Sequence, residues 1–317
     1  MRISLLLIDV AGGLLCPLQH SRKDELLTVQ YQPDPGKILN LIIDTGSAGT
    51  ILFDHSANGL GDTVGSVAFQ GYRIGLVHSH NRGSLICQGS NLDITRPDVT
   101  TGFNSGLDSV ADGILGLGQR ALQRALGDEG ALPFLFSESA PAWSSIYICQ
   151  NDIRFVSGQH FRRPFNYFPL VSQYYWATSI ASLLVGSNEL VTSSTAVVFD
   201  TGSNFFGFSP TLFVDVTRDL FNNSCKDDLV LNIHGQEVKF TPAEYLVEDN
   251  CGDFAIGEID PSPLGDLSRS EVMIVGTRGL RIHEFGIHKG TSSRNDVLSI
   301  SFNYSKIVLR SQLRFPD

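Results

Sequence analysis

Apolar positions along this chain fall in short runs that are broken every few residues by Gly, Ser, Asn or Asp. A helical heptad pattern is missing, and the chain contains 31 glycines. Short apolar runs bounded by turn residues are typical of β-strands. The pattern therefore favours a protein built from many short strands over a helix bundle.

One run occurs twice with the same ending: residues 41–47 read LIIDTGS, and residues 197–203 read VVFDTGS. A second pattern, two apolar residues followed by Gly, comes after each copy at nearly the same distance, at residues 114–116 and 274–276. Two signals that recur in the same order indicate an internal repeat. We therefore expect two similar lobes, each with a buried strand that ends in Asp.

The repeated aspartates, Asp44 and Asp200, suggest a specific chemistry. The apolar runs before them are rich in β-branched residues and fit strands buried on both faces, and the turn residues Asp and Gly end each strand. If the lobes face each other, the two carboxylates meet about 3 Å apart and share one proton. Such a pair titrates as a unit and offers a base beside an acid, which can activate water against a carbonyl group.

Composition and charge narrow the class of protein. The chain has 317 residues, 42% of them apolar and 18% charged, and a net charge of −10, which fits a folded soluble protein. The acidic balance and the lack of a basic stripe argue against a nucleic-acid partner. No apolar stretch reaches the roughly 18 residues of a transmembrane helix. The start, MRISLLLIDVAGGLLC, can be read as a poor secretory signal interrupted by Asp9, or as an ordinary N-terminal strand with an extension.

Cysteine and histidine spacing gives no metal motif. The five cysteines stand at positions 16, 87, 149, 225 and 251, so at least one thiol is unpaired within the chain. No C-x-x-C spacing exists, and His78 with His80 alone is too little for a metal site, so we expect none. Two sequons, at Asn222 and Asn303, would accept glycans only in a secretory compartment.

Together the two DTGS motifs, DGILGLG at 112–118, YYWATSIASLLVG at 174–186 and IVGTRGLR at 274–281 resemble the pepsin family of aspartic proteases, over roughly residues 14–302. The resemblance implies an all-β, bilobal fold with two pseudo-two-fold-related lobes, residues 14–165 and 166–317, after an extension or signal remnant at 1–13. It implies a monomeric aspartic endopeptidase without a cofactor, which binds an extended peptide or protein substrate between the lobes and favours hydrophobic residues around the cut. It also implies binding of statine-type (pepstatin-like) inhibitors, and a secretory, extracellular or vacuolar (lysosome-like) location.

The resemblance assigns roles to residues within and around the repeat. Asp44 and Asp200 match the catalytic dyad. The supporting positions are glycines whose N–H groups hold the carboxylates, threonines that clasp the opposite loop and serines that hydrogen-bond the aspartates: Gly46 and Gly202, Thr45 and Thr201, Ser47 and Ser203. Cys225 and Cys251 match a disulfide that closes hairpins of the second lobe. The pairing of Cys16, Cys87 and Cys149 stays open.

The flap over the cleft departs from the family pattern. The matching stretch is SVAFQGYRIGLV at 66–77, where Phe69 is the best match to the usual flap tyrosine and Tyr72, after Gly71, is the alternative. Ile51 occupies the position of the tryptophan that bonds this tyrosine, so both hydrogen-bonding partners are lost together, which need cost little. With Ile114, these residues are the expected flap and substrate-binding positions. The departure motivates an alternative function, a catalytically weak or inactive binding or inhibitor protein on the same scaffold.

Overall fold

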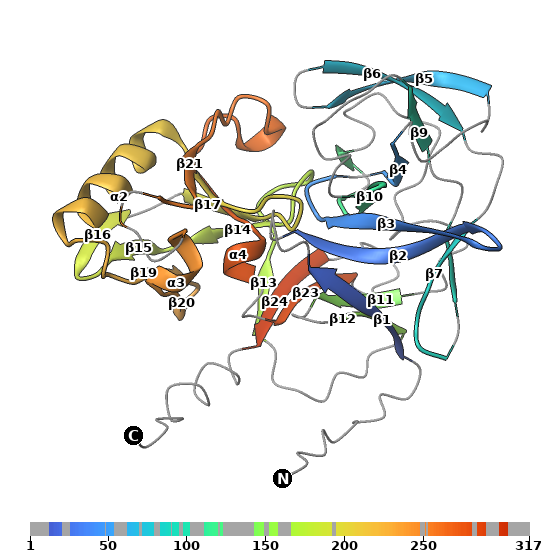
Figure 1. The fold of residues 1–317 in the computed structure, drawn as a ribbon. Helices are drawn as coiled ribbons and strands as arrows, with labels where there is room; N and C mark the ends of the chain where they lie inside the picture. The colour runs from blue at the N-terminus through green and yellow to red at the C-terminus, as the bar shows by residue number, and fades with distance from the viewer. Residues whose placement is uncertain are drawn as a thin grey trace, which may run out of the picture.

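The computed structural model describes most of the chain in separate stretches. These are residues 13–20, 26–47, 49–53, 62–69, 72–78, 83–89, 91–94, 98–101, 111–119, 121–122, 143–148, 152–157, 166–191, 195–247, 251, 253–280, 284–289 and 298–303. Strands predominate in these stretches, as the short apolar runs predict, and they form one large and two small sheets (Figure 1). The expectation of an all-β fold is confirmed.

The large sheet gathers fifteen strands from both ends of the chain. In spatial order its path is β13 (Asn166–Pro169), β24 (Leu298–Asn303), β23 (Glu284–Lys289), β11 (Trp143–Ile148), β12 (Asp152–Ser157), β1 (Gly13–His20), β2 (Leu27–Asp34), β3 (Lys37–Asp44), β10 (Gly113–Gly116), β4 (Ile51–Leu52), β9 (Asp98–Thr101), β6 (Tyr72–His78) and β5 (Asp62–Phe69), with β7 (Gly83–Leu85) and β8 (Leu92–Ile94) attached at β2. Strand β23 comes from the second half of the sequence but pairs with β11 of the first half, and β24 pairs with β23 and with β13. This part of the sheet therefore joins the two halves.

Residues 177–280 form the two small sheets and four described helical elements. One sheet is β14 (Ala177–Ile180), β17 (Thr195–Phe199), β22 (Val272–Val275), β18 (Phe206–Phe208) and β21 (Ile256–Glu258); the other is β16 (Asn188–Val191), β15 (Ser182–Val185), β19 (Leu229–Ile233) and β20 (Gln236–Phe240). The helices are α2 (Pro210–Asn222), α3 (Pro242–Tyr245), the 3₁₀ turn η4 (Gly265–Leu267) and α4 (Thr277–Leu280). In Figure 1 these elements lie on the left, opposite β2–β10 on the right.

The internal repeat predicted from sequence appears as repeated strand topology. In the first half β10 runs parallel to β3, with Gly116 opposite Asp44, and antiparallel to β4. In the second half β22 runs parallel to β17, with Val275 opposite Phe199, and antiparallel to β18. In each half, then, the strand that leads to the aspartate lies beside a later strand carrying the second repeated pattern.

Close backbone packing explains why that second pattern ends in Gly. A Cβ atom on Gly116 would lie 2.2 Å from the carbonyl oxygen of Gly49, and one on Gly276 would lie 2.5 Å from those of Ser203 and Phe205. Those distances are far below van der Waals contact, so a side chain at either position would push away the loop that follows the aspartate. The two glycines let the loops sit directly on their supporting strands.

Apolar residues before each aspartate are buried on both faces, as expected. All five residues of β17 and the last four of β3 are buried. Trp176 is buried as well, and its Nε1–H donates to the carbonyl oxygen of Leu117 at 2.7 Å, which ties the second half to the strand end of β10. The aspartates therefore end strands that belong to a continuous core.

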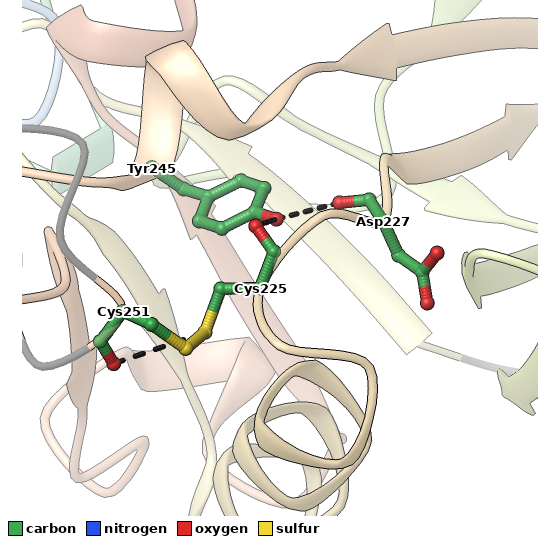
Figure 2. Close-up of a disulfide and its surroundings, with 4 residues drawn as sticks. All are labelled: Cys225, Asp227, Tyr245 and Cys251. Atoms are coloured by element: carbon green, nitrogen blue, oxygen red, sulfur yellow. Dashed lines mark hydrogen bonds between the residues drawn. A yellow bond between two sulfur atoms is a disulfide. The ribbon is translucent and has the colours of Figure 1, made fainter.

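Two disulfides are formed among the described residues. Cys225 pairs with Cys251, as the resemblance implies, and beside it the hydroxyl of Tyr245 donates to the carbonyl oxygens of Asp227 at 2.6 Å and Cys225 at 3.2 Å (Figure 2). Cys16 pairs with Cys87, which resolves the pairing left open by the sequence and joins β1 to the segment after β7. Cys149 lies outside the described residues, as do residues 1–12 of the predicted N-terminal extension.

Candidate active site

The two DTGS loops meet between the halves and hold each other through their threonines. The N–H of Thr45 donates to Oγ1 of Thr201 at 3.1 Å, and the N–H of Thr201 donates to Oγ1 of Thr45 at 3.0 Å. Each hydroxyl in turn donates to a carbonyl oxygen of the opposite strand, Thr45 to Phe199 and Thr201 to Ile43, both at 2.7 Å. Four crossed hydrogen bonds thus fix the relative position of the loops.

This crossing brings each aspartate against the glycine of the other loop. A Cβ atom built on Gly46 would lie 2.8 Å from Oδ1 of Asp200, and one built on Gly202 would lie 2.3 Å from Cγ of Asp44. Only glycine allows this approach, because any side chain would displace a carboxyl group. The carboxyl group of each aspartate thus lies against the opposite loop, and the two carboxyl groups are close enough for a hydrogen bond.

Asp44 is surrounded by hydrogen-bond donors. Its Oδ1 accepts from the N–H groups of Gly46 at 2.7 Å and Ser47 at 3.1 Å, and its Oδ2 accepts from the hydroxyl of Ser47 at 2.5 Å. Three donors aimed at one carboxyl group stabilise its charged form. The first loop therefore supplies three hydrogen bonds to the carboxyl group of Asp44.

Asp200 sits in a poorer environment for charge. Its Oδ1 accepts from the N–H of Gly202 at 2.9 Å. By exposed area the residue is only partly buried, but protein atoms crowd its carboxyl group, and this burial is the largest cause that raises its pKa well above the usual value. The negative charge of Asp44 and a hydrogen bond with it raise the pKa further, against weaker lowering by the N–H groups of Gly202 and Gly46. Burial and the negative charge of Asp44 thus favour the protonated form of Asp200.

The two serines of the repeat behave differently. The hydroxyl of Ser47 donates to Asp44, as the resemblance implies. The hydroxyl of Ser203 is buried, and no hydrogen-bond partner for it lies among the described residues. The backbone N–H of Ser203 donates to the main-chain oxygen of Asp200 at 3.3 Å, and not to its carboxyl group. The expected bond from Ser203 to Asp200 is therefore not formed.

Tyr175 also approaches the pair of aspartates, and the sequence reasoning did not single it out. Its pKa is raised by burial first and then by the negative charges of Asp200, Asp266 and Asp44, so its hydroxyl stays protonated within electrostatic reach of the dyad. Ser172 holds the loop in place: its hydroxyl donates to Asp266 at 2.7 Å and accepts from the N–H of Tyr175 at 3.1 Å. The sequence signal that could have pointed to Tyr175 was the aromatic pair in YYW at 174–176.

The stretch that we expect to be the flap forms a hairpin. Strands β5 and β6 pair antiparallel, with Phe69 opposite Tyr72, and Gly71 at the tip lies outside the described residues, as do the side chains of Phe69 and Tyr72. Ile51 and Ile114 face each other across β4 and β10, and both are buried. Both isoleucines are thus packed within the sheet, and Ile114 lies beside the strand that carries Asp44. Contact with a substrate stays a prediction.

Metal ligands and membrane-spanning helices are both absent from the described stretches. No three His, Cys, Asp or Glu side chains in these stretches come together as ligands for a metal ion. In the same part of the chain, no helix has the length and apolar character needed to cross a membrane.

Comparison of the chain with models of protein families and with curated proteins gave no match. Among solved structures it is similar to the crystal structure of an aspartic proteinase from Irpex lacteus, with a TM-score of 0.68 over 92% of this chain and 98% of that chain. The two sequences are 18% identical over this match. At that identity the likeness shows the fold: the chain has the bilobal, all-β fold of a pepsin-like aspartic proteinase.

Proposed function

We propose that the protein is an aspartic endopeptidase, which hydrolyses peptide bonds with a water molecule activated by Asp44 and Asp200. The observation that carries the proposal is the crossed geometry of the two DTGS loops. It places two carboxyl groups together, one with three hydrogen-bond donors and one with a raised pKa. An ionised carboxylate beside a protonated one is the pair that general base and general acid catalysis of this reaction needs.

In the proposed reaction Asp44 takes a proton from the water while the water oxygen attacks the carbonyl carbon of the peptide bond. Asp200 gives its proton to the carbonyl oxygen, and a neutral tetrahedral diol forms. Asp44 then passes its new proton to the amide nitrogen, the carbon–nitrogen bond breaks, and Asp200 recovers a proton from one diol hydroxyl. The dyad returns to its starting state, and no other group needs to gain or lose a proton.

The pepsin-like fold supports the proposed class of substrate and of inhibitor. The substrate is an extended peptide or protein segment that lies between the halves, with hydrophobic residues around the cut, and statine-type molecules inhibit. We place the protein, as a monomer, in an oxidising compartment of the secretory pathway, outside the cell or in an acidic vacuole, because its two disulfides are stable there. Asp44 and Asp200 act without a metal or organic cofactor.

The test is cleavage of a mixed peptide library between about pH 3 and pH 7, with and without a statine-type inhibitor. We expect cleavage that the inhibitor abolishes, and a loss of at least about 1,000-fold in Asp44→Asn and in Asp200→Asn. Asp215→Asn is the matched control, since Asp215 forms an ion pair with Arg218 on helix α2 and has no part in the dyad. Absence of cleavage by the folded wild-type protein at every pH would overturn the proposal in favour of a binding or inhibitor protein.

A further inference from the structure

The C-terminal end of helix α2 carries one of the two glycosylation sequons, Asn222-Asn223-Ser224. All three residues are exposed; Asn222 ends the helix, and the N–H of Ser224 in the following turn donates to the carbonyl oxygen of Phe221 at 3.1 Å. A sequon accepts a glycan when it lies on the surface of a secreted protein. The other sequon begins at Asn303, the last residue of β24, and its next two residues lie outside the described stretches. The structure therefore gives a surface context to Asn222.

Two residues of this turn adopt a backbone conformation that usually belongs to glycine. The angle φ is 54° at Ser224 and 55° at Cys225. Helices commonly end in this left-handed region, and glycine is preferred there because a Cβ atom makes the conformation costly. Cys225 is needed for its disulfide with Cys251, but within the described stretches no hydrogen bond of the Ser224 side chain accounts for a serine. The sequon accounts for it, because it requires Ser or Thr at this position.

Helix α2 also exposes apolar side chains next to the sequon. Phe221 is 55% exposed and Val214 is 57% exposed, and they are two of the four large apolar side chains that are exposed in the described stretches. The ring of Phe221 contacts the ring of Phe254 edge to face, with centroids 5.0 Å apart, so it is held in place beside Asn222. An aromatic ring that is held in place and half open to solvent is a surface that a partner of matching chemistry can cover.

We propose that Asn222 is N-glycosylated and that the first N-acetylglucosamine of the glycan packs on the ring of Phe221. The inference rests on the secretory location proposed above. The side-chain nitrogen of Asn222 attacks the anomeric carbon of an oligosaccharide carried on a lipid pyrophosphate. A carbon–nitrogen bond forms, the bond from that carbon to the pyrophosphate oxygen breaks, the amide nitrogen loses one proton, and the lipid pyrophosphate leaves. The C–H groups on one face of the sugar ring then cover the aromatic ring while its hydroxyl groups stay in water.

A covalently attached sugar suits this face better than a free protein partner. Stable protein interfaces bury about 1,200–2,000 Å² in total, whereas the apolar side chains that this helix exposes are Val214 and Phe221. A contact of that size is too small to hold a free partner, but attachment through Asn222 gives the sugar a high effective concentration at Phe221. In Figure 1 helix α2 lies at the outer left edge of the fold, and β3, which leads to the first DTGS loop, lies on the other side. We therefore expect catalysis not to depend on the glycan.

The first test maps glycans on the full chain, secreted from a eukaryotic host behind an added leader. Enzymatic removal of the glycans in heavy-oxygen water, followed by mass spectrometry of peptides, identifies each occupied asparagine. We expect most molecules to carry a glycan at Asn222, and none to carry one there in Asn222→Gln or in Ser224→Gly, which should fold because glycine tolerates a positive φ. Asn223→Gln is the matched control, since it leaves the sequon intact and should stay glycosylated. Folded, secreted wild-type protein without a glycan at Asn222 would overturn the inference.

A double-mutant cycle tests the contact with Phe221. The glycan is first trimmed to the one N-acetylglucosamine that is linked to the protein, so that only the proposed contact remains. Loss of this sugar in Asn222→Gln should lower the thermal midpoint by about 1–3 °C in the wild-type background and should have no effect in Phe221→Ser. In Val214→Ser the effect should persist, because Val214 lies two turns earlier on the helix, beyond the first sugar. Equal effects of the sugar with and without Phe221 would refute the contact.

Peptide cleavage by the same samples separates this inference from the proposed function. Asn222→Gln should cleave peptides as the wild-type protein does. If the wild-type protein is glycosylated and the cycle shows coupling but no peptide is cleaved, the proposed function fails and the inference stands. If it cleaves peptides but Asn222 is unmodified, the function stands and the inference fails. A dimer of the wild-type protein that Phe221→Ser abolishes would also overturn the inference, in favour of a protein partner on this face.

Discussion

Replacement of Thr201 by valine tests the idea that the crossed threonines hold the two halves together. Valine has nearly the same shape, so packing at this fully buried position changes little. The substitution removes the acceptor for the N–H of Thr45 and the donor to the carbonyl oxygen of Ile43. Each buried polar group left without a partner costs about 1–3 kcal/mol, which gives a total loss of about 2–6 kcal/mol in the free energy of unfolding.

Equilibrium unfolding in urea measures this loss. With an m-value of about 3 kcal/mol per M, the midpoint should fall by about 0.7–2 M in Thr201→Val. Catalytic activity should fall as well, because the loop that carries Asp200 loses its link to the opposite strand.

Thr217→Val is the matched control. The hydroxyl of Thr217 donates only along its own helix, to Phe213 at 2.6 Å and Val214 at 3.3 Å, so its loss should cost less than about 1 kcal/mol. A midpoint for Thr201→Val no lower than that of Thr217→Val would show that the crossed bonds do not stabilise the fold as argued.

Three further predictions follow from the same geometry. Gly202→Ala should lower activity at least about 100-fold, because its Cβ would lie 2.3 Å from the first carboxyl group, whereas Gly49→Ala, with nothing within 4 Å, should be tolerated. Because the folded protein raises the pKa of Asp200, the stability this group contributes is complete below about pH 4 and is lost as pH rises through the folded value. The thermal midpoint should therefore fall as pH rises over this range in the wild-type protein, and it should fall less in Asp200→Asn. The folded protein lowers the pKa of Asp260, so the stability contributed by that group changes with pH in the opposite direction, and Asp260→Asn is the control. Cys225→Ser, which opens a loop with a sequence separation of 26, should cost about 3–4 kcal/mol in the free energy of unfolding, measurable against wild type with and without reductant.

The dyad could be located from the sequence because its signal is local and repeated. Each copy of DTGS follows a buried strand, and the second repeated pattern supplies the strand beside it, so the topology around Asp44 and Asp200 could be foreseen. The bridge between Cys225 and Cys251 was likewise implied by the family resemblance. The pairing of Cys16 with Cys87 was not, because it depends on how β1 and the segment after β7 are placed by sheet pairing over a separation of 71 residues.

The state of Ser203 could not be read from its own motif. Identical tetrapeptides predict identical hydrogen bonds, but Thr277, from a distant part of the chain, holds the backbone of the second loop through two donors. The environment of Tyr175 was equally non-local, because it depends on Asp266 through Ser172. Local sequence therefore predicts which groups reach the site, and contacts from remote segments decide what those groups do there.

The crossed threonines also give a physical reason why the DTGS motif occurs in both halves although the two halves otherwise differ in sequence. Thr45 and Thr201 each bond the opposite loop as donor and acceptor, so a substitution of either threonine removes hydrogen-bond partners from both loops. A substitution in the surrounding strands affects only local packing. A substitution of either crossed threonine needs a compensating change in the opposite loop. The two copies of the motif therefore constrain each other, and neither threonine can be replaced without loss of hydrogen bonds in both loops.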